Sequence, residues 1–153
     1  MTAQDVVAAY ASRGLTVATA ESLTAGLVAA SLADVPGASA TLRGGVVSYA
    51  TELKSALLGV SEALLSESGS VDPEVARQMA LGARAACGAD YAVSTTGAAG
   101  PEPHDGKPVG TVFVGIAGPD GTEVREYLFS GERAEIREAA RDAALSALLE
   151  ALS

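Results

Sequence analysis

The sequence predicts an α/β protein, a three-layer α/β/α sandwich around a mixed, mostly parallel sheet of about five strands. Two observations support this fold class. Predicted helices separate the first three predicted strands, and strands connected through helices run parallel. A hairpin around residue 120 then adds antiparallel strands. The chain has 153 residues, 48% of them hydrophobic, so a single domain over residues 1–153 can bury a core.

The first half of the chain is assigned from hydrophobic spacing and from signals at element ends. Gly14 is a natural stop for the first helix, and Thr51 and Ser61 are the expected caps of two later helices. The predicted elements are a helix (3–13), a strand (15–20), a helix (about 23–33), a strand (44–50) and the two helices that begin near residues 51 and 61.

The second half has one particularly strong helix start. Asp72, Pro73 and Glu74 supply a cap, a proline in the first turn and an acid. That helix should run to Cys87 and stop at Gly88. A strand (91–96), a long loop (97–108), a hairpin (109–117 and 123–129) and a final helix (132–152) follow. A loop of this length inside a small domain is usually functional or disordered.

Composition excludes several classes of protein. The net charge of −9 argues against nucleic acid as a partner, because such sites need clustered cations. One cysteine, Cys87, excludes an internal disulfide, and one histidine, His104, argues against a zinc site. We expect neither a metal nor a cofactor. No apolar run approaches membrane-spanning length and no signal peptide is apparent, so the expected location is the cytoplasm, away from membranes.

Residues 16–26 are the first candidate site. A strand that turns into a helix aims its last residues out of the sheet edge, where open α/β sheets bind ligands. Ser22 stands at that junction, where it could act as a nucleophile. Hydroxyls at helix starts usually serve as N-caps, and this alternative applies to both Ser22 and Thr24.

Lys54 is the second candidate, because it follows a predicted strand across a strand-to-helix junction. Its functional interpretation is a general base for Ser22, since Ser–Lys pairs are a known form of activated nucleophile. The pKa of a free lysine is about 10.4, so a base near neutrality needs a shift of ~3 units, which burial can supply. The alternative is a solvated surface lysine.

Two further segments could bind an anion. Small residues at 97–101 leave backbone N–H groups open to a ligand. Arg133, Arg137 and Arg141 lie on one face of the last helix, where they could bind an anion or pair with nearby glutamates. The anion interpretation is stronger for Arg133, which directly follows a strand end. If all four segments meet at one sheet edge, they combine a nucleophile (Ser22), a base (Lys54), backbone donors and an arginine for an anion (Arg133). That combination suggests acyl transfer on a substrate that carries a phosphate.

Five segments, in this order, carry a resemblance to a known family: 20–26 (AESLTAG), 49–54 (YATELK), 96–101 (TGAAGP), 107–112 (KPVGTV) and 129–133 (FSGER). The sequence is similar to the C-terminal domain of the competence/damage-inducible protein CinA, or PncC-type nicotinamide-nucleotide amidase. The family often has Cys, Gly and Asn at three positions that here are Leu23, Ala25 and Thr51.

The resemblance implies hydrolysis of the carboxamide of nicotinamide mononucleotide (NMN) to nicotinate mononucleotide and ammonia, without a cofactor or metal. Ser22 would be the nucleophile, Lys54 its base and Tyr49 a hydrogen-bonding helper. The resemblance also implies a homo-oligomer. The substrate-binding residues would be Glu21, Thr24, Gly26, Thr96, Gly97, Ala98, Gly100, Arg133 and Arg137.

Two other functions remain open from the sequence. The pocket could belong to a non-catalytic nucleotide-binding or regulatory module, or to an amidase that acts on another small nucleotide amide. The joint presence of Ser22, Tyr49 and Lys54 favours an enzyme, since binding alone does not need all three. The shape of the pocket, which would decide the substrate, is not encoded in any local motif.

Overall fold

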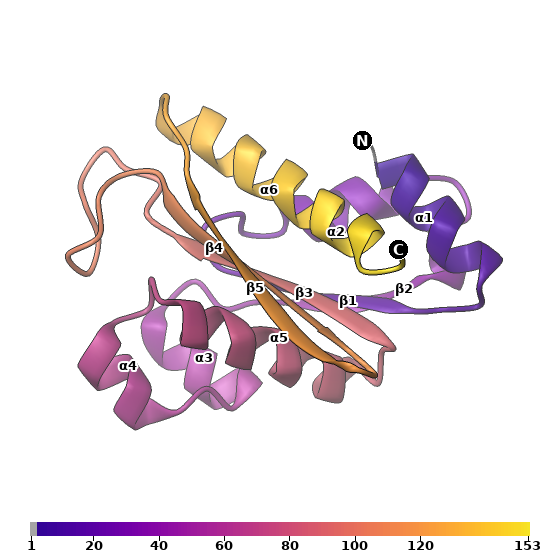
Figure 1. Ribbon diagram of the computed structural model, residues 1–153, viewed down its shortest axis with the longest axis horizontal. Helices are drawn as coiled ribbons and strands as arrows, with labels where there is room; N and C mark the ends of the chain where they lie inside the picture. The colour runs from indigo at the N-terminus through magenta and orange to yellow at the C-terminus, as the bar shows by residue number, and fades with distance from the viewer. Residues whose placement is uncertain (1–2) are drawn as a thin grey trace.

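The computed structural model describes residues 3–153, which form one mixed sheet between two layers of helices (Figure 1). The strands are β1 (Val17–Glu21), β2 (Leu42–Val47), β3 (Tyr91–Gly97), β4 (Thr111–Gly118) and β5 (Gly121–Leu128). The helices are α1 (Ala3–Ser12), α2 (Leu27–Ala33), α3 (Thr51–Leu58), α4 (Glu62–Ser68), α5 (Pro73–Cys87) and α6 (Arg133–Glu150), with a short 3-10 turn η1 (Ala38–Ala40). The predicted α/β/α sandwich with five strands is confirmed.

The sheet brings the ends of three strands together at one edge. The strand order is β2-β1-β3-β4-β5, and β1 pairs in parallel with both β2 and β3. The pairs β3–β4 and β4–β5 are antiparallel, so four of the five strands run in the same direction. Glu21, the last residue of β1, lies beside Val47 of β2 and Thr95 of β3. The segments that follow these three strands therefore leave the sheet at a shared edge, as the candidate site requires.

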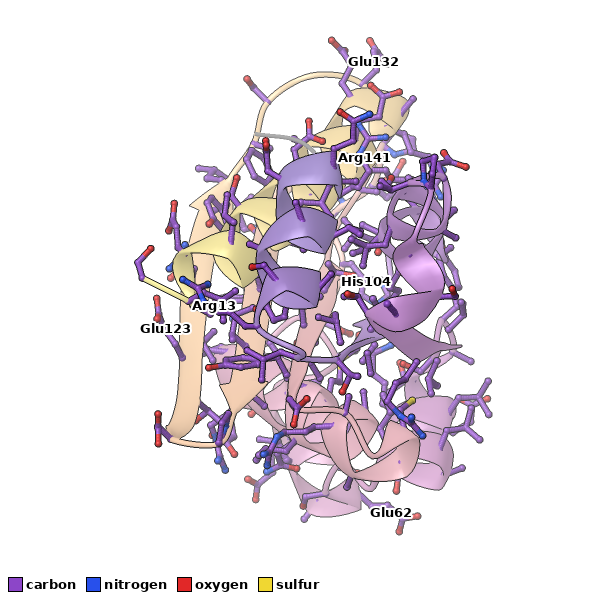
Figure 2. All side chains as sticks on the ribbon, turned by 90° about the vertical axis from the view of Figure 1, so that its right-hand side faces the viewer. Arg13, Glu62, His104, Glu123, Glu132 and Arg141 are labelled. Carbon is purple, nitrogen blue, oxygen red and sulfur yellow. The ribbon has the colours of Figure 1, made fainter. Side chains whose placement is uncertain are left out.

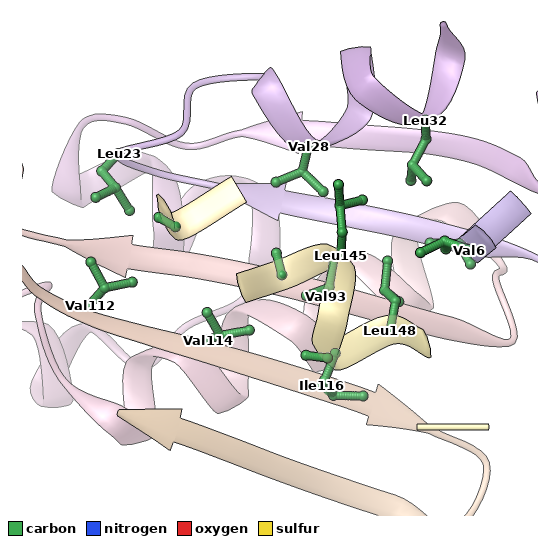
Figure 3. Close-up of a cluster of buried hydrophobic side chains, with 14 of the residues drawn as sticks. Val6, Leu23, Val28, Leu32, Val93, Val112, Val114, Ile116, Leu145 and Leu148 are labelled. Carbon is green, nitrogen blue, oxygen red and sulfur yellow. The ribbon is translucent and has the colours of Figure 1, made fainter. Parts of the chain in front are cut away.

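Helices α1, α2 and α6 cover one face of the sheet, and α3, α4 and α5 lie on the other (Figure 1). The larger core lies under α6, where Val28 and Leu32 of α2 pack with Leu148 of α6 against the sheet (Figure 3). The Tyr10 hydroxyl donates to the Leu148 carbonyl oxygen at 2.6 Å, which ties α1 to the end of α6. On the other face, Met79 of α5 is fully buried.

Most of the expected helix ends are present. Asp72 accepts hydrogen bonds from the Glu74 and Val75 amides and caps α5, and Ser61 accepts from the Leu64 amide and caps α4. The prediction for Thr51 was wrong: Thr51 is the first residue of α3, and Ala50 precedes it without a side-chain cap.

Two element boundaries differ from the prediction in ways that matter for the site. Helix α2 begins at Leu27, because residues 22–26 form a turn in which Ala25 (φ 47°) and Gly26 (φ 103°) adopt left-handed conformations. Strand β2 ends at Val47, and residues 48–50 connect it to α3. Ser22 and residues 48–50 thus lie in the segments that leave the sheet at its shared edge.

The contact between α5 and α3 depends on Gly82. A Cβ atom at this position would lie 2.0 Å from the Leu58 carbonyl oxygen, a backbone atom that cannot rotate away. We therefore expect Gly82→Ala to lower the free energy of unfolding by about 1–3 kcal/mol, despite the better helix propensity of alanine. Urea unfolding checks this, with Ala86→Ser on the exposed side of α5 as the control. An unfolding midpoint for Gly82→Ala equal to wild type would contradict the close packing.

Most charged side chains lie on the outer surface of the molecule, and Lys54 and Glu21 are the fully buried exceptions among residues 3–153. In Figure 2, Glu62 and Glu132 project from opposite ends of the view. Within residues 3–153, no helix combines the length and the apolar character that crossing a membrane would need.

Candidate active site

Ser22 follows the last residue of β1 and is held beside β3. Its amide donates to the Thr95 carbonyl oxygen at 3.0 Å, which extends the β1–β3 pairing by one residue. The tight turn that follows is closed by a bond from the Ala25 amide to the Ser22 carbonyl oxygen at 3.0 Å. The Ser22 side chain is 8% exposed and borders a pocket. A serine fixed in this way presents its hydroxyl to a ligand with little loss of freedom on binding.

Lys54 approaches Ser22 from α3, and its ammonium nitrogen lies 3.0 Å from the Ser22 hydroxyl oxygen. The residue is fully buried, although lysine is rarely found without exposure. Its Nζ also donates to the Ser48 carbonyl oxygen at 2.6 Å and lies 3.4 Å from that of Tyr49. Among residues 3–153, no carboxylate forms an ion pair with Lys54.

Burial lowers the pKa of Lys54 to about 8, although the negative charges of Asp105 and Glu52 act to raise it. A neutral amine has two N–H groups and one lone pair. The two carbonyl oxygens can take the N–H groups, which leaves the lone pair for the Ser22 proton. The site can therefore hold the neutral amine as well as the ammonium, which would donate to all three oxygens, and the predicted proximity of Ser22 and Lys54 is present in the structure.

A pocket of about 290 Å³ opens beside Ser22. Its walls come from the β1–α2 turn, the β2–α3 connection, the α4–α5 connection, the β3–β4 loop and the start of α6. The lining residues are Ser22, Leu23, Tyr49, Ser70, Gly97, Ala98, Ala99, Gly100, Pro101, Glu102, Pro103, His104 and Arg133. Three of the predicted substrate-binding residues of the β3–β4 loop, Gly97, Ala98 and Gly100, are among them.

Arg133 is the arginine of α6 that reaches the pocket. Its guanidinium donates to the Gly100 carbonyl oxygen at 2.5 Å and to the Tyr49 hydroxyl at 2.8 Å. A guanidinium has five N–H donors, and these two contacts use two of them. Tyr49 is 55% exposed, and the hydrogen bond found for its hydroxyl is the one with Arg133. Tyr49 thus contacts Arg133 through its hydroxyl and lies near Lys54 through its backbone carbonyl, and its role as a helper stays a prediction.

Arg137 contacts the Ser22 turn. Its guanidinium donates to the carbonyl oxygens of Leu23 at 2.7 Å and Thr24 at 3.2 Å, and it does not line the pocket. The structure therefore places Arg137 where it holds the turn that follows Ser22. Leu23 contributes to the core beneath this turn and is 3% exposed (Figure 3).

Glu21, Thr24 and Gly26, all predicted to bind substrate, also bond within the protein. The buried Glu21 carboxylate accepts hydrogen bonds from the amides of Gly26, Val28 and Ala29 at 2.9–3.1 Å, so it caps α2. The Thr24 hydroxyl bonds to the Thr95 hydroxyl at 2.7 Å. These contacts shape the turn that carries Ser22, and none of the three residues lines the pocket.

Thr96 is buried, and its hydroxyl donates to the Ser70 carbonyl oxygen at 2.7 Å. Sequence reasoning missed Ser70 and the neighbouring pair His104 and Asp105 as site residues. The loop containing His104 was recognised only by its length, and Ser70 lies in a serine-rich connection without a motif. Within residues 3–153, no group of three or more His, Cys, Asp or Glu side chains is arranged to hold a metal ion.

Comparisons with known proteins all point to one family. A family model described as the CinA C-terminal domain matches residues 1–152. A CinA-like protein of Frankia casuarinae is 52% identical over 132 residues, and the match covers 86% of this chain and 30% of that relative. A CinA-like protein of Geobacter sulfurreducens is 50% identical, and the match covers 84% of this chain and 31% of that relative. The chain thus spans about a third of the length of these relatives.

Solved structures resemble the chain over nearly all of its length. The competence/damage inducible protein CihA from Agrobacterium tumefaciens has a TM-score of 0.93 and 37% identity, with 98% of this chain and 92% of that chain covered. A CinA superfamily protein from Klebsiella pneumoniae has a TM-score of 0.95 and 32% identity, and the match covers 98% of this chain and 94% of that chain.

Proposed function

Because the chain belongs to the CinA C-terminal domain family, we propose that it is a nicotinamide-nucleotide amidase that hydrolyses NMN with a Ser22–Lys54 dyad. The observation that carries this proposal is the fully buried lysine amine 3.0 Å from the Ser22 hydroxyl. Binding a nucleotide does not require a buried amine, and burying one has a cost in free energy. A nucleophile that must lose its proton does require such a base.

The proposed reaction begins when neutral Lys54 takes the proton of the Ser22 hydroxyl. The Ser22 oxygen then attacks the carboxamide carbon, and the carbonyl π-electrons move to oxygen to give a tetrahedral intermediate. When the C–N bond breaks, the Lys54 ammonium returns its proton to the leaving nitrogen and ammonia departs. Attack by water on the resulting ester, with Lys54 again as base, releases nicotinate mononucleotide and restores Ser22.

Arg133 is the proposed phosphate ligand. Arg133 lines the pocket that also contains Ser22 and makes two of its five possible hydrogen bonds within the protein, to Gly100 and Tyr49. A phosphate bound there would hold the nucleotide while its carboxamide meets Ser22. Binding energy from the distant phosphate can in this way support the reaction at the amide.

Ammonia release from NMN tests the proposed function. We expect turnover of NMN, and a drop of at least about tenfold in kcat/KM for nicotinamide riboside, which lacks the phosphate. Turnover of another nucleotide amide in preference to NMN would reassign the substrate. Saturable NMN binding with no ammonia from any of these substrates would instead support the binding module.

The pH dependence of the rate should follow the charge of Lys54. Because the pKa of Lys54 is lowered to about 8, the neutral base is a minor form at pH 7 and the main form above pH 8. We expect kcat/KM to rise roughly tenfold per pH unit below pH 7 and to level off above pH 8. Initial rates in buffers of constant ionic strength measure this, and a rate that is flat from pH 6 to pH 9 would contradict a lysine base.

A further inference from the structure

Residues 101–107, here called the pocket loop, follow Gly100 and extend away from the sheet at one end of the molecule (Figure 1). Pro101, Glu102, Pro103 and His104 of this loop line the pocket that contains Ser22. The loop is thus a large part of the pocket wall, although it belongs to no helix or strand of the sandwich. Something outside the sheet must hold it in place.

The Asp105 carboxylate supplies that hold. It accepts hydrogen bonds from the Ser70 amide at 2.7 Å and from the Ser70 hydroxyl at 2.9 Å. Ser70 lies in the connection between α4 and α5, is 5% exposed, and is itself tied to β3 by the Thr96 hydroxyl. The fit is close, because a Cβ atom on Gly69 would lie 2.5 Å from Asp105 Cγ.

We propose that Asp105 is a positioning residue of the amidase site, which fastens the pocket loop to Ser70 and keeps His104 in the wall of the nucleotide pocket. This inference rests on the proposed function. His104 lies beside the same carboxylate, and its Nε2 is 3.3 Å from an Asp105 oxygen. Loss of the negative charge would weaken both hydrogen bonds from Ser70, because a neutral amide oxygen accepts them less strongly, and would remove the charged neighbour of His104. Nucleotide binding would then weaken more than the chemical step.

The charge of Asp105 also reaches the dyad. Partial burial acts to raise the pKa of Asp105, but the hydrogen bonds from Ser70 and the nearby His104 bring it below its usual value. Asp105 is therefore ionised throughout the working range of the enzyme. The charged groups that act on Lys54 are Asp105 and Glu52, and both raise its pKa. Removal of the Asp105 charge should move the acid limb of the rate profile to lower pH.

Asp105→Asn is the most informative variant. Asp105 has φ 50°, a left-handed conformation that asparagine tolerates well, so the backbone can stay unchanged. We expect KM for NMN to rise about tenfold, with kcat above the acid limb changed by less than about threefold. Ser70→Ala keeps the hydrogen bond from its backbone amide to Asp105 and loses the one from its hydroxyl. Its KM for NMN should therefore rise by only about threefold. The matched control is Asp120→Asn, because Asp120 is exposed in the turn between β4 and β5.

Two measurements separate this inference from the amidase proposal. Hydrogen exchange at the Ser70 amide needs no substrate, and it should accelerate at least about tenfold in Asp105→Asn and stay unchanged in Asp120→Asn. Titration calorimetry with NMN needs no turnover and should show the same weakening as KM. If wild type binds NMN without releasing ammonia, the amidase proposal fails while these two results still decide the role of Asp105. The proposed role of Asp105 would be overturned if the Ser70 amide of Asp105→Asn exchanged at the wild-type rate, or if the variant bound NMN with unchanged affinity.

Discussion

Replacement of Ser22 by alanine is expected to lower kcat for ammonia release from NMN by at least about 10³-fold, equivalent to ~4 kcal/mol of transition-state stabilisation. The reason is that no other hydroxyl is hydrogen-bonded to Lys54 among residues 3–153. The affinity for NMN should change by less than about threefold, because the proposed phosphate ligand Arg133 is unchanged in this variant. A coupled ammonia assay and titration calorimetry measure the two quantities.

Ser66→Ala provides the control for this prediction. Ser66 lies on the exposed surface of α4 and does not border the pocket, so full activity is expected. If Ser22→Ala keeps more than about a tenth of wild-type turnover, water must attack the amide directly and Ser22 is not the nucleophile.

Replacement of Lys54 by methionine is expected to reduce kcat by a similar factor, because the Ser22 hydroxyl then has no base. Since the two residues act as one unit, Ser22→Ala with Lys54→Met should be no slower than either single variant. The chain contains one other lysine, Lys107, and Lys107→Arg is the matched control that should retain activity. Effects of the single variants that multiply in the double variant would contradict the dyad.

The same variant should not unfold the protein. A lysine whose folded pKa lies near 8, below its ordinary 10.5, binds fewer protons in the folded state than in the unfolded state between these two values. The unfolding free energy of wild type should therefore increase with pH across that window. Methionine removes this dependence and fills a similar volume, so stability at pH 7 should be equal to or above wild type. Urea unfolding at pH 7 and pH 10 measures both effects.

The sheet and the positions of the reacting groups could be predicted because they follow from local signals. Strands β1, β2 and β3 end at residues 21, 47 and 97, and their parallel pairing places the segments that follow them at one edge of the sheet. The shared edge predicts that Ser22 and Lys54 lie close together although they are 32 positions apart in the chain, and the structure has them in contact. The predicted start of α2 near residue 23 was about four residues too early, because the left-handed conformations of Ala25 and Gly26 and the cap from the Glu21 carboxylate delay the helix to Leu27.

The roles of individual polar residues depend on contacts that spacing does not encode. Arg133 and Arg137 lie four residues apart on one helix face, yet one borders the pocket and the other binds two carbonyl oxygens of the Ser22 turn. Asp105 meets Ser70 across 35 positions and through two irregular segments. No periodicity relates such segments, so this part of the pocket wall becomes visible only in three dimensions.

The most direct test of a neutral lysine beside Ser22 is the NMR titration of protein labelled with ¹³C at lysine Cε. Two lysines give two resonances, and Lys107→Arg assigns one of them. We expect the Lys54 resonance to titrate with a midpoint near 8, and we expect this midpoint to coincide with the acid limb of kcat/KM. A Lys54 midpoint at the ordinary value of about 10.5, together with full activity at pH 8, would contradict it.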